Sequence, residues 1–159
     1  MIRLSRNAFL TRLHKEGVLQ LVSASDEMKA AYLKKSESHL ISARLLLDND
    51  LFEQSVSMAY YSMYYSVMAL FFAIGIKCEN HAAAIILLRE VFDRDNAEIG
   101  EAKRERIDKQ YYVMSAPVRE EVVALIRTAE SFNADLGDFM DRLTTTKIDQ
   151  FRNTFIAMI

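Results

Sequence analysis

The chain has 159 residues, the size of a single domain, and its 51% hydrophobic content is enough for a sizeable core. With one proline, four glycines and abundant helix-forming residues, the composition favours an all-α protein. The formal net charge of -2 excludes a general positive field for gripping nucleic acid, so any such role must rest on a local patch.

Residues 1–25 are expected to form a short amphipathic helix, an N-terminal helical arm beside the core. Apolar residues recur at Leu4, Ala8 and Leu13 and continue over 18–22. Gly17 is expected to interrupt or end this helix.

A long helix is predicted to run from an N-cap at Ser23, Ser25 or Asp26 to about Asp48. Its apolar side is expected to carry Met28, Ala31, Tyr32, Ser38, Leu45 and Leu46, with Leu33, Leu40 and Leu47 nearby. Its solvent side is expected to carry Lys34, Lys35, Glu37 and Arg44. A tight turn over 48–50 then folds the next helix back antiparallel.

Residues 51–76 are predicted to form the central helix of the fold. No charged residue occurs after Glu53 until Lys77, so no side offers an ordinary polar surface. Beside two apolar stripes the helix has a face of small residues: Ser55, Ser62, Ser66, Ala69 and Ala73. Such a helix packs on several sides, and its small face allows close approach of its neighbours. Gly75 is the expected stop, because glycine adopts positive φ without steric cost.

The uncharged run also has the length of a membrane span. Serines and tyrosines dilute its apolar character, however, and neither end carries the basic cluster or tryptophan that usually anchors a span. We therefore interpret it as a buried core helix.

Two helices are predicted in the segment that follows. Residues 76–80 form a short loop, and Asn80 caps a helix that continues to Phe92. The segment DRDNAEIG, residues 93–100, is the next break. The helix after it is highly charged over 101–109 and is expected to pack by its second half, through Ile107, Tyr111 and Met114.

The last part of the chain is predicted to form two more helices. One begins near Ser115 and Pro117, since proline is tolerated in a first turn, and continues to about Leu143. Its apolar stripe consists of Val118, Val122, Leu125, Ile126, Ala129, Phe132, Leu136 and Phe139. Thr146 with Asp149 resembles a capping box that opens a C-terminal helix within 144–159.

These elements predict an up-and-down helical bundle of five or more helices. The bundle is expected to be a single domain, 1–159, whose core spans about 26–143.

Cysteine and histidine usage argues against disulfides, metals and cofactors. Cys78 is the only cysteine, so the chain has neither an internal disulfide nor a zinc-binding cysteine pair. His14, His39 and His81 all lack the glutamate three residues earlier that a di-metal helical bundle requires. We therefore expect no metal and no cofactor. Charged residues interrupt the N-terminal segment and no secretory signal is evident, so we expect a cytoplasmic location.

Tyrosines crowd the central helix in the run SVSMAYYSMYYSVM, residues 55–68. Their rings are expected to fill the core while their hydroxyl groups reach backbone or water. The alternative is that part of this surface is a dimer interface, where tyrosine is enriched.

Lys77 and His81 lie beside a predicted helix N-terminus, where unpaired backbone N–H groups and the helix dipole favour an anion. They are candidates for a phosphate pocket. The alternative is that His81 simply occupies the first helical turn.

From Ala30 to about Leu143 the sequence resembles the HEPN domain (higher eukaryotes and prokaryotes nucleotide-binding), in particular its small prokaryotic single-domain members. The resemblance rests on Ala43–Leu47, on the A-Y-Y-x-M-Y pattern of Ala59–Tyr64, and on the G-I-x-x-x-x-H pattern of Gly75–His81. It implies a four- or five-helix bundle, usually a homodimer, in prokaryotic toxin–antitoxin or defence systems. The commonest partner in the family is a minimal nucleotidyltransferase.

Many HEPN proteins are metal-independent ribonucleases that use an arginine and a histidine four to six residues later, brought together from two protomers. Arg106 matches the arginine, but Tyr111 stands at the histidine position of the Arg-x4-His form, and no histidine follows His81. A tyrosine titrates at about 10, so the group that exchanges protons near neutral pH is missing. We therefore predict no ordinary HEPN ribonuclease activity.

The resemblance and this departure together predict a non-catalytic homodimer that binds a nucleotide or RNA near Lys77, Arg104 and Arg106 and partners a minimal nucleotidyltransferase. Some family members carry a tyrosine near the motif that the partner modifies with AMP, and Tyr111 or Tyr112 is the candidate here. The alternatives are a ribonuclease toxin with a degenerate motif and a helical dimerisation module without a ligand.

Overall fold

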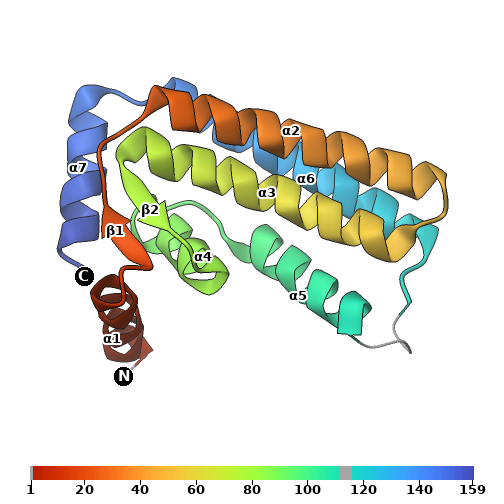
Figure 1. Ribbon diagram of the computed structural model, residues 1–159, viewed down its shortest axis with the longest axis horizontal. Coiled ribbons are helices and arrows are strands. Elements are labelled where there is room, and N and C mark those ends of the chain that lie inside the picture. The colour runs from red at the N-terminus through yellow and green to blue at the C-terminus, as the bar shows by residue number, and fades with distance from the viewer. Residues whose placement is uncertain (1, 112–115) are drawn as a thin grey trace.

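Helices dominate the computed structural model, which describes residues 2–111 and 116–159. Three long helices lie side by side: α2 (Asp26–Asp48), α3 (Phe52–Ile74) and α6 (Arg119–Asp141) (Figure 1). The shorter helices are α1 (Ile2–Lys15), α4 (His81–Glu90), α5 (Ala97–Tyr111) and α7 (Thr145–Ile156). The predicted all-α helical bundle is confirmed.

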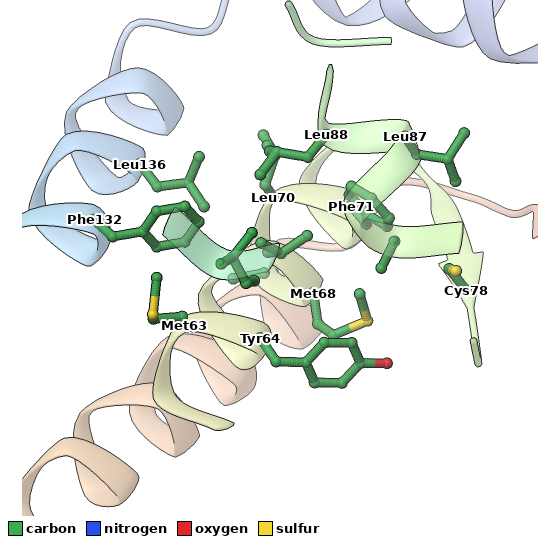
Figure 2. Packing of buried hydrophobic residues seen from close by; sticks show 14 of the residues in the cluster. Met63, Tyr64, Met68, Leu70, Phe71, Cys78, Leu87, Leu88, Phe132 and Leu136 are labelled. Atoms are coloured by element: carbon green, nitrogen blue, oxygen red, sulfur yellow. The ribbon is translucent and has the colours of Figure 1, made fainter. Parts of the chain in front are cut away.

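Helix α3 is the centre of the core, as its uncharged sequence predicts. Figure 2 shows its side chains, among them Met63 and Leu70, packed between Phe132 and Leu136 of α6 and Leu88 of α4. Of the described helices, α3 alone has the length and apolar composition of a membrane span, but 72% of its most apolar stretch is buried inside the protein. That burial is what a core helix requires.

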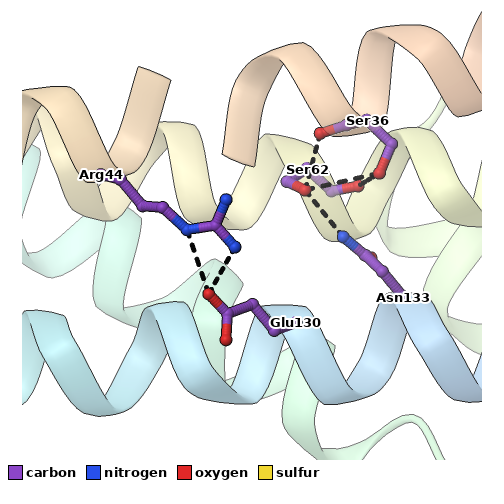
Figure 3. Close-up of polar contacts among 5 residues, drawn as sticks. All are labelled: Ser36, Arg44, Ser62, Glu130 and Asn133. Carbon is purple, nitrogen blue, oxygen red and sulfur yellow. Dashed lines mark hydrogen bonds and ion pairs between the residues drawn. The ribbon is translucent and has the colours of Figure 1, made fainter. Parts of the chain in front are cut away.

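The small face of α3 packs against α2 and α6 through a hydrogen-bonded contact (Figure 3). The Ser36 hydroxyl donates to the carbonyl of Ser62 at 2.6 Å, and the Ser62 hydroxyl donates to the carbonyl of Ser36 at 2.8 Å. Asn133 of α6 donates from Nδ2 to Ser62 Oγ at 2.8 Å. The contact between α2 and α3, which we call the α2–α3 seam, continues toward the N-terminus of α3. There the Ser55 hydroxyl donates to the carbonyl of Ala43 at 2.7 Å. The predicted close approach at the small face is confirmed.

Gly75 ends α3, as predicted, in the left-handed region with φ 94°. A Cβ atom there would collide with Arg152 and with the carbonyl of Val22. The Arg152 guanidinium donates from Nη1 to the carbonyls of Val22 at 2.9 Å and Ile74 at 2.8 Å. Helix α7 is thereby tied to the end of the central helix.

Two segments predicted as helix and loop form a small antiparallel sheet instead. Strand β1 (Leu19–Leu21) pairs with β2 (Ile76–Cys78), with Gln20 opposite Lys77. A short apolar run has no periodicity that separates helix from strand, and Gly17, with φ 75°, ends α1 before it. The pairing depends on a distant segment, so the local pattern did not reveal it.

The helix α2 and its Ser25 N-cap are confirmed, but its predicted apolar side is only partly right. Tyr32, Leu33, Leu40 and Leu47 pack against the core as expected. Met28 is 37% exposed and Leu45 is 59% exposed, whereas the buried residues of α2 are Ser36 and Ala43. The seam with α3 is so close that only small side chains fit in it, and the larger ones lie beside it. The predicted solvent residues Lys34, Lys35, Glu37 and Arg44 are exposed as expected.

The remaining helices differ from prediction mainly at their ends. Helix α5 begins at Ala97, inside the predicted break, and it packs by its first half, where Ile99 and Ala102 are fully buried. Of the residues predicted to pack from its second half, Ile107 is half-buried, while the side chain of Tyr111 and all of Met114 lie outside the described residues. Asn80 caps α4 and the predicted stripe of α6 is largely buried, but Thr144, and not Thr146, caps α7.

Candidate functional site

His81 is the first residue of α4 and its ring lies against the tyrosines of α3. The His81 and Tyr64 rings stack with their centroids 3.9 Å apart and an interplanar angle of 1°. The hydroxyl of Tyr60 lies 2.7 Å from His81 Nδ1. The Asn80 side chain fixes the start of the helix by accepting from the Ala83 amide at 2.9 Å. The imidazole is therefore held by ring contacts with Tyr60, Tyr61 and Tyr64 and by the hydrogen bond with Tyr60.

Arg106 approaches the same tyrosines from α5. Its guanidinium carbon lies 5.4 Å from the centroid of Tyr60 and 5.1 Å from that of Tyr61, a cation–π arrangement with both rings. Arg106 also donates from Nη1 to the hydroxyl of Tyr61 at 2.7 Å. The edge of the Tyr61 ring in turn faces His81, with centroids 6.1 Å apart. Three helices thus bring His81 and Arg106 to one place.

The charges around His81 favour its neutral form. Burial lowers the pKa of His81, and the nearby cations Arg106 and Lys103 lower it further. Burial also raises the pKa of Tyr60, an effect that Arg106 partly offsets. A neutral imidazole that accepts the Tyr60 hydrogen at Nδ1 keeps a hydrogen on Nε2. We call Arg106, Lys103, His81, Tyr60 and Tyr61 the Arg106 site.

Arg106 retains unused binding capacity. Its Nε–H is buried without an acceptor, and among the described side chains, 5–107 and 116–159, no carboxylate forms an ion pair with it. A buried donor without a partner costs about 1–3 kcal/mol, more when the group is charged. The Arg106 site therefore has an excess of positive charge and a spare donor, an arrangement suited to an anion.

The other predicted site residues lie apart from this cluster. Lys77, on β2, pairs with Glu79 at 3.0 Å, and Arg104 pairs with Glu101 at 2.8 Å with its side chain 71% exposed. The side chain of Tyr111 and all of Tyr112 lie outside the described residues. Of the predicted candidates, the structure brings together His81 and Arg106.

Sequence reasoning missed three members of the Arg106 site and one neighbour. The sequence assigns Tyr60, Tyr61 and Tyr64 only a general core or interface role, and it does not single out Lys103 within the charged segment 101–109. The available signal was the dense spacing of tyrosines over 60–65, which places rings on adjacent faces of one helix. Nothing in that spacing indicates which distant residues the rings contact.

Other reactive groups are few in the described part of the chain. No group of three or more His, Cys, Asp and Glu residues there is placed to hold a metal ion. Cys78 is buried, and burial raises the pKa of its thiol to about 11. The thiol is thus protonated near neutral pH and is a poor nucleophile.

Comparisons with known proteins identify related sequences. The family model described as the HEPN domain matches residues 30–137. The chain is 28% identical over 109 residues to a Methanocaldococcus jannaschii protein named "Putative toxin", with 64% of this chain and 81% of that protein covered. It is 30% identical over 133 residues to a UPF0332 protein of Pyrococcus horikoshii, with 80% and 94% covered. It is 36% identical over 55 residues to a UPF0332 protein of Gloeobacter violaceus, with 35% and 44% covered.

Proposed function

The chain belongs to the HEPN domain family, and from this membership and the Arg106 site we propose that it is a nucleotide- or RNA-binding subunit without catalytic activity. It binds the phosphate of its ligand at Arg106. We further propose that it acts in the cytoplasm as a homodimer and that it partners a minimal nucleotidyltransferase in a toxin–antitoxin or defence system. The name of the Methanocaldococcus jannaschii relative agrees with such a setting.

One observation carries the binding proposal: the buried Nε–H of Arg106, which has no acceptor among the described side chains. Guanidinium groups bind phosphate through parallel N–H donors, and Arg106 uses Nη1 on Tyr61 while its Nε–H has no acceptor. Lys103 adds a second positive charge, close enough to lower the pKa of His81. The neutral His81 contributes a ring hydrogen. Together these groups match an anion with several acceptor oxygens.

The position of His81 favours a second candidate function, an RNA-cleaving toxin. The motif histidine is missing after Arg106, but the structure places another imidazole beside the arginine, against the same tyrosines. Burial lowers the pKa of His81, so its ring is neutral near pH 7. In the tautomer whose Nδ1–H donates to the Tyr60 hydroxyl, Nε2 is free to accept a proton, as a general base must. In this candidate, Arg106 holds the phosphate and His81 exchanges the proton.

A thermal-shift experiment tests the proposal. A ligand that binds only the folded state raises the melting temperature, so we expect nucleotides or a short single-stranded RNA to stabilise the protein. Arg106→Ala should abolish the shift, whereas Arg127→Ala, at an exposed arginine on α6, should keep it. If no anion raises the melting temperature of the unmodified chain, the chain is a helical module without a ligand and the proposal fails.

An RNA-cleavage assay with a metal chelator separates the two candidates. A binding subunit leaves the RNA intact. An RNA-cleaving toxin degrades it, and both Arg106→Ala and His81→Ala stop the degradation. Cleavage that survives both substitutions comes from a contaminating nuclease. In that case the proposal of a binding subunit is retained.

A further inference from the structure

A groove of about 380 Å³ runs between α5 and α6 and shares no lining residue with the Arg106 site. Its floor is apolar and includes the buried Val56 and Ala102, with Ala124 and Leu125 of α6. The groove exists because α5 packs mainly on α3 and touches α6 little (Figure 1). Binding pockets commonly have volumes of about 300–1,000 Å³. The groove is thus large enough to receive a ligand.

The rim of the groove is acidic. Glu98, Glu101 and Glu105 line it from α5 and Glu121 lines it from α6, and the described lining includes no lysine, arginine or histidine. The three α5 carboxylates are spaced by three and four residues, so they share one side of the helix and repel one another. Arg104 pairs with Glu101, but among the described side chains, 5–107 and 116–159, Glu98 and Glu105 have no ion-pair partner.

Helix α5 therefore separates its charges onto two sides. Arg106 follows Glu105 by one residue, a rotation of about 100° around the helix, and it faces the tyrosines of α3. An anion at Arg106 leaves the rim carboxylates other than Glu101, which pairs with Arg104, without added positive charge. A cationic occupant of the groove would relieve the repulsion among them.

The shape of the groove fits a short helical segment. Its walls, 98–105 and 121–128, each run about two helical turns, or roughly 10 Å at 1.5 Å per residue. Val118, 53% exposed and next to the lining residue Pro117, extends the apolar surface at one end. An open groove with an apolar floor between two helices is the surface that an amphipathic helix recognises.

We propose that the α5–α6 groove docks a basic amphipathic segment of a partner protein. Apolar side chains of that segment occupy the floor formed by Val56, Ala102 and Leu125. Lysine or arginine side chains on either side pair with Glu98 and Glu105. This surface is independent of anion binding at Arg106, so either proposal can fail without the other.

A peptide titration tests the docking surface on the full chain. The probe is a fluorescein-labelled peptide of about 14 residues, long enough to form a helix on binding, with leucines on one face and lysines flanking them. A second peptide has glutamates in place of the lysines. We expect the basic peptide to bind and to shift backbone amide signals over 97–105 and 121–128, and the acidic peptide not to bind.

Matched variants separate the groove from general charge attraction. Glu98→Lys with Glu105→Lys removes the net negative charge of the four rim glutamates, and Glu37→Lys with Asp138→Lys makes the same change of charge at exposed acidic residues outside the groove. The rim variant should lower the affinity for the basic peptide by about tenfold or more, and the control variant should lower it by less than about twofold. Circular dichroism shows whether each variant is folded. Ala124 is an exposed residue of the groove floor, and in Ala124→Trp the larger side chain would fill that floor. This variant should also weaken binding of the basic peptide while leaving the rim charges in place.

Four results would overturn the proposal. The first is equal weakening by the rim and control variants, and the second is amide shifts confined to other helices. The third is binding of the small polycation spermine in the groove without binding of the peptide. The fourth is a change in oligomeric state caused by the rim variant alone, which would identify a second copy of this chain as the occupant.

Discussion

Two buried serines on α3, one turn apart, provide a matched test of the packing. Ser62 and Ser66 are both fully buried, but Ser62 Oγ donates to Ser36 and accepts from Asn133, whereas Ser66 Oγ has no hydrogen-bond partner among the described residues. Ser62→Ala removes two hydrogen bonds, each worth about 1 kcal/mol, so the free energy of unfolding should fall by about 2 kcal/mol. For a chain of this size that loss lowers the melting temperature by about 4–8 °C.

Ser66→Ala should raise the free energy of unfolding or leave it unchanged. It removes a buried hydroxyl group that gains no hydrogen bond on folding, so stability should stay the same or rise by about 1 kcal/mol. The change in helix propensity is the same at both positions and cancels in the comparison. Urea unfolding followed by circular dichroism measures both values. Equal losses for the two variants would refute the assigned roles of Ser62 and Ser66.

Three other predictions concern the fold and its titratable groups. Gly75→Ala should lower the free energy of unfolding by about 2 kcal/mol or more, since alanine is strained at φ 94° and its Cβ meets Arg152; an unchanged urea midpoint would contradict this. The pKa of His81 is lower in the folded state than its ordinary value of 6.5, so unfolding takes up a proton and stability should fall as the pH drops through that value. His81→Asn should flatten this dependence in urea unfolding measured from about pH 7 to about pH 5, and an unchanged slope would count against it. The buried thiol of Cys78, whose pKa is raised to about 11, should react with a thiol reagent at least about a hundredfold more slowly in the native protein than in denaturant; equal rates would show that the thiol is accessible.

Features of the fold that depend on neighbouring residues could be predicted from the sequence. The absence of charge from Gln54 to Ile76 identified α3, and Gly75 and Ser25 marked helix ends because their roles are local. The buried stripe of α6 followed from its helical spacing. These patterns need no knowledge of distant contacts.

Features that depend on distant segments could not be predicted in the same way. The β1–β2 pair joins segments that lie far apart in the chain, and neither has enough periodicity to indicate a strand. The buried side of α2 was misassigned because the seam with α3 selects Ser36 and Ala43 for their size, against the rule that large apolar residues lie inside.

The Arg106 site was predicted only in part for the same reason. Arg106 and His81 were identified singly, Arg106 from the ribonuclease motif of the family and His81 from its place at a helix N-terminus and in the Gly75–His81 pattern. Their common contact is with Tyr60 and Tyr61, which are on a third helix. The absence of a histidine after Arg106 in the sequence therefore did not mean the absence of an imidazole near it.

The most direct test of the account is equilibrium binding of a fluorescein-labelled single-stranded RNA, with a nucleotide as competitor, followed by fluorescence anisotropy. We predict that the unmodified chain binds, that binding weakens as salt is added, and that Arg106→Ala loses about tenfold or more in affinity while Arg127→Ala keeps it. Equal affinities for the chain and for Arg106→Ala, with both folded, would contradict the assignment of Arg106 as the phosphate-binding residue.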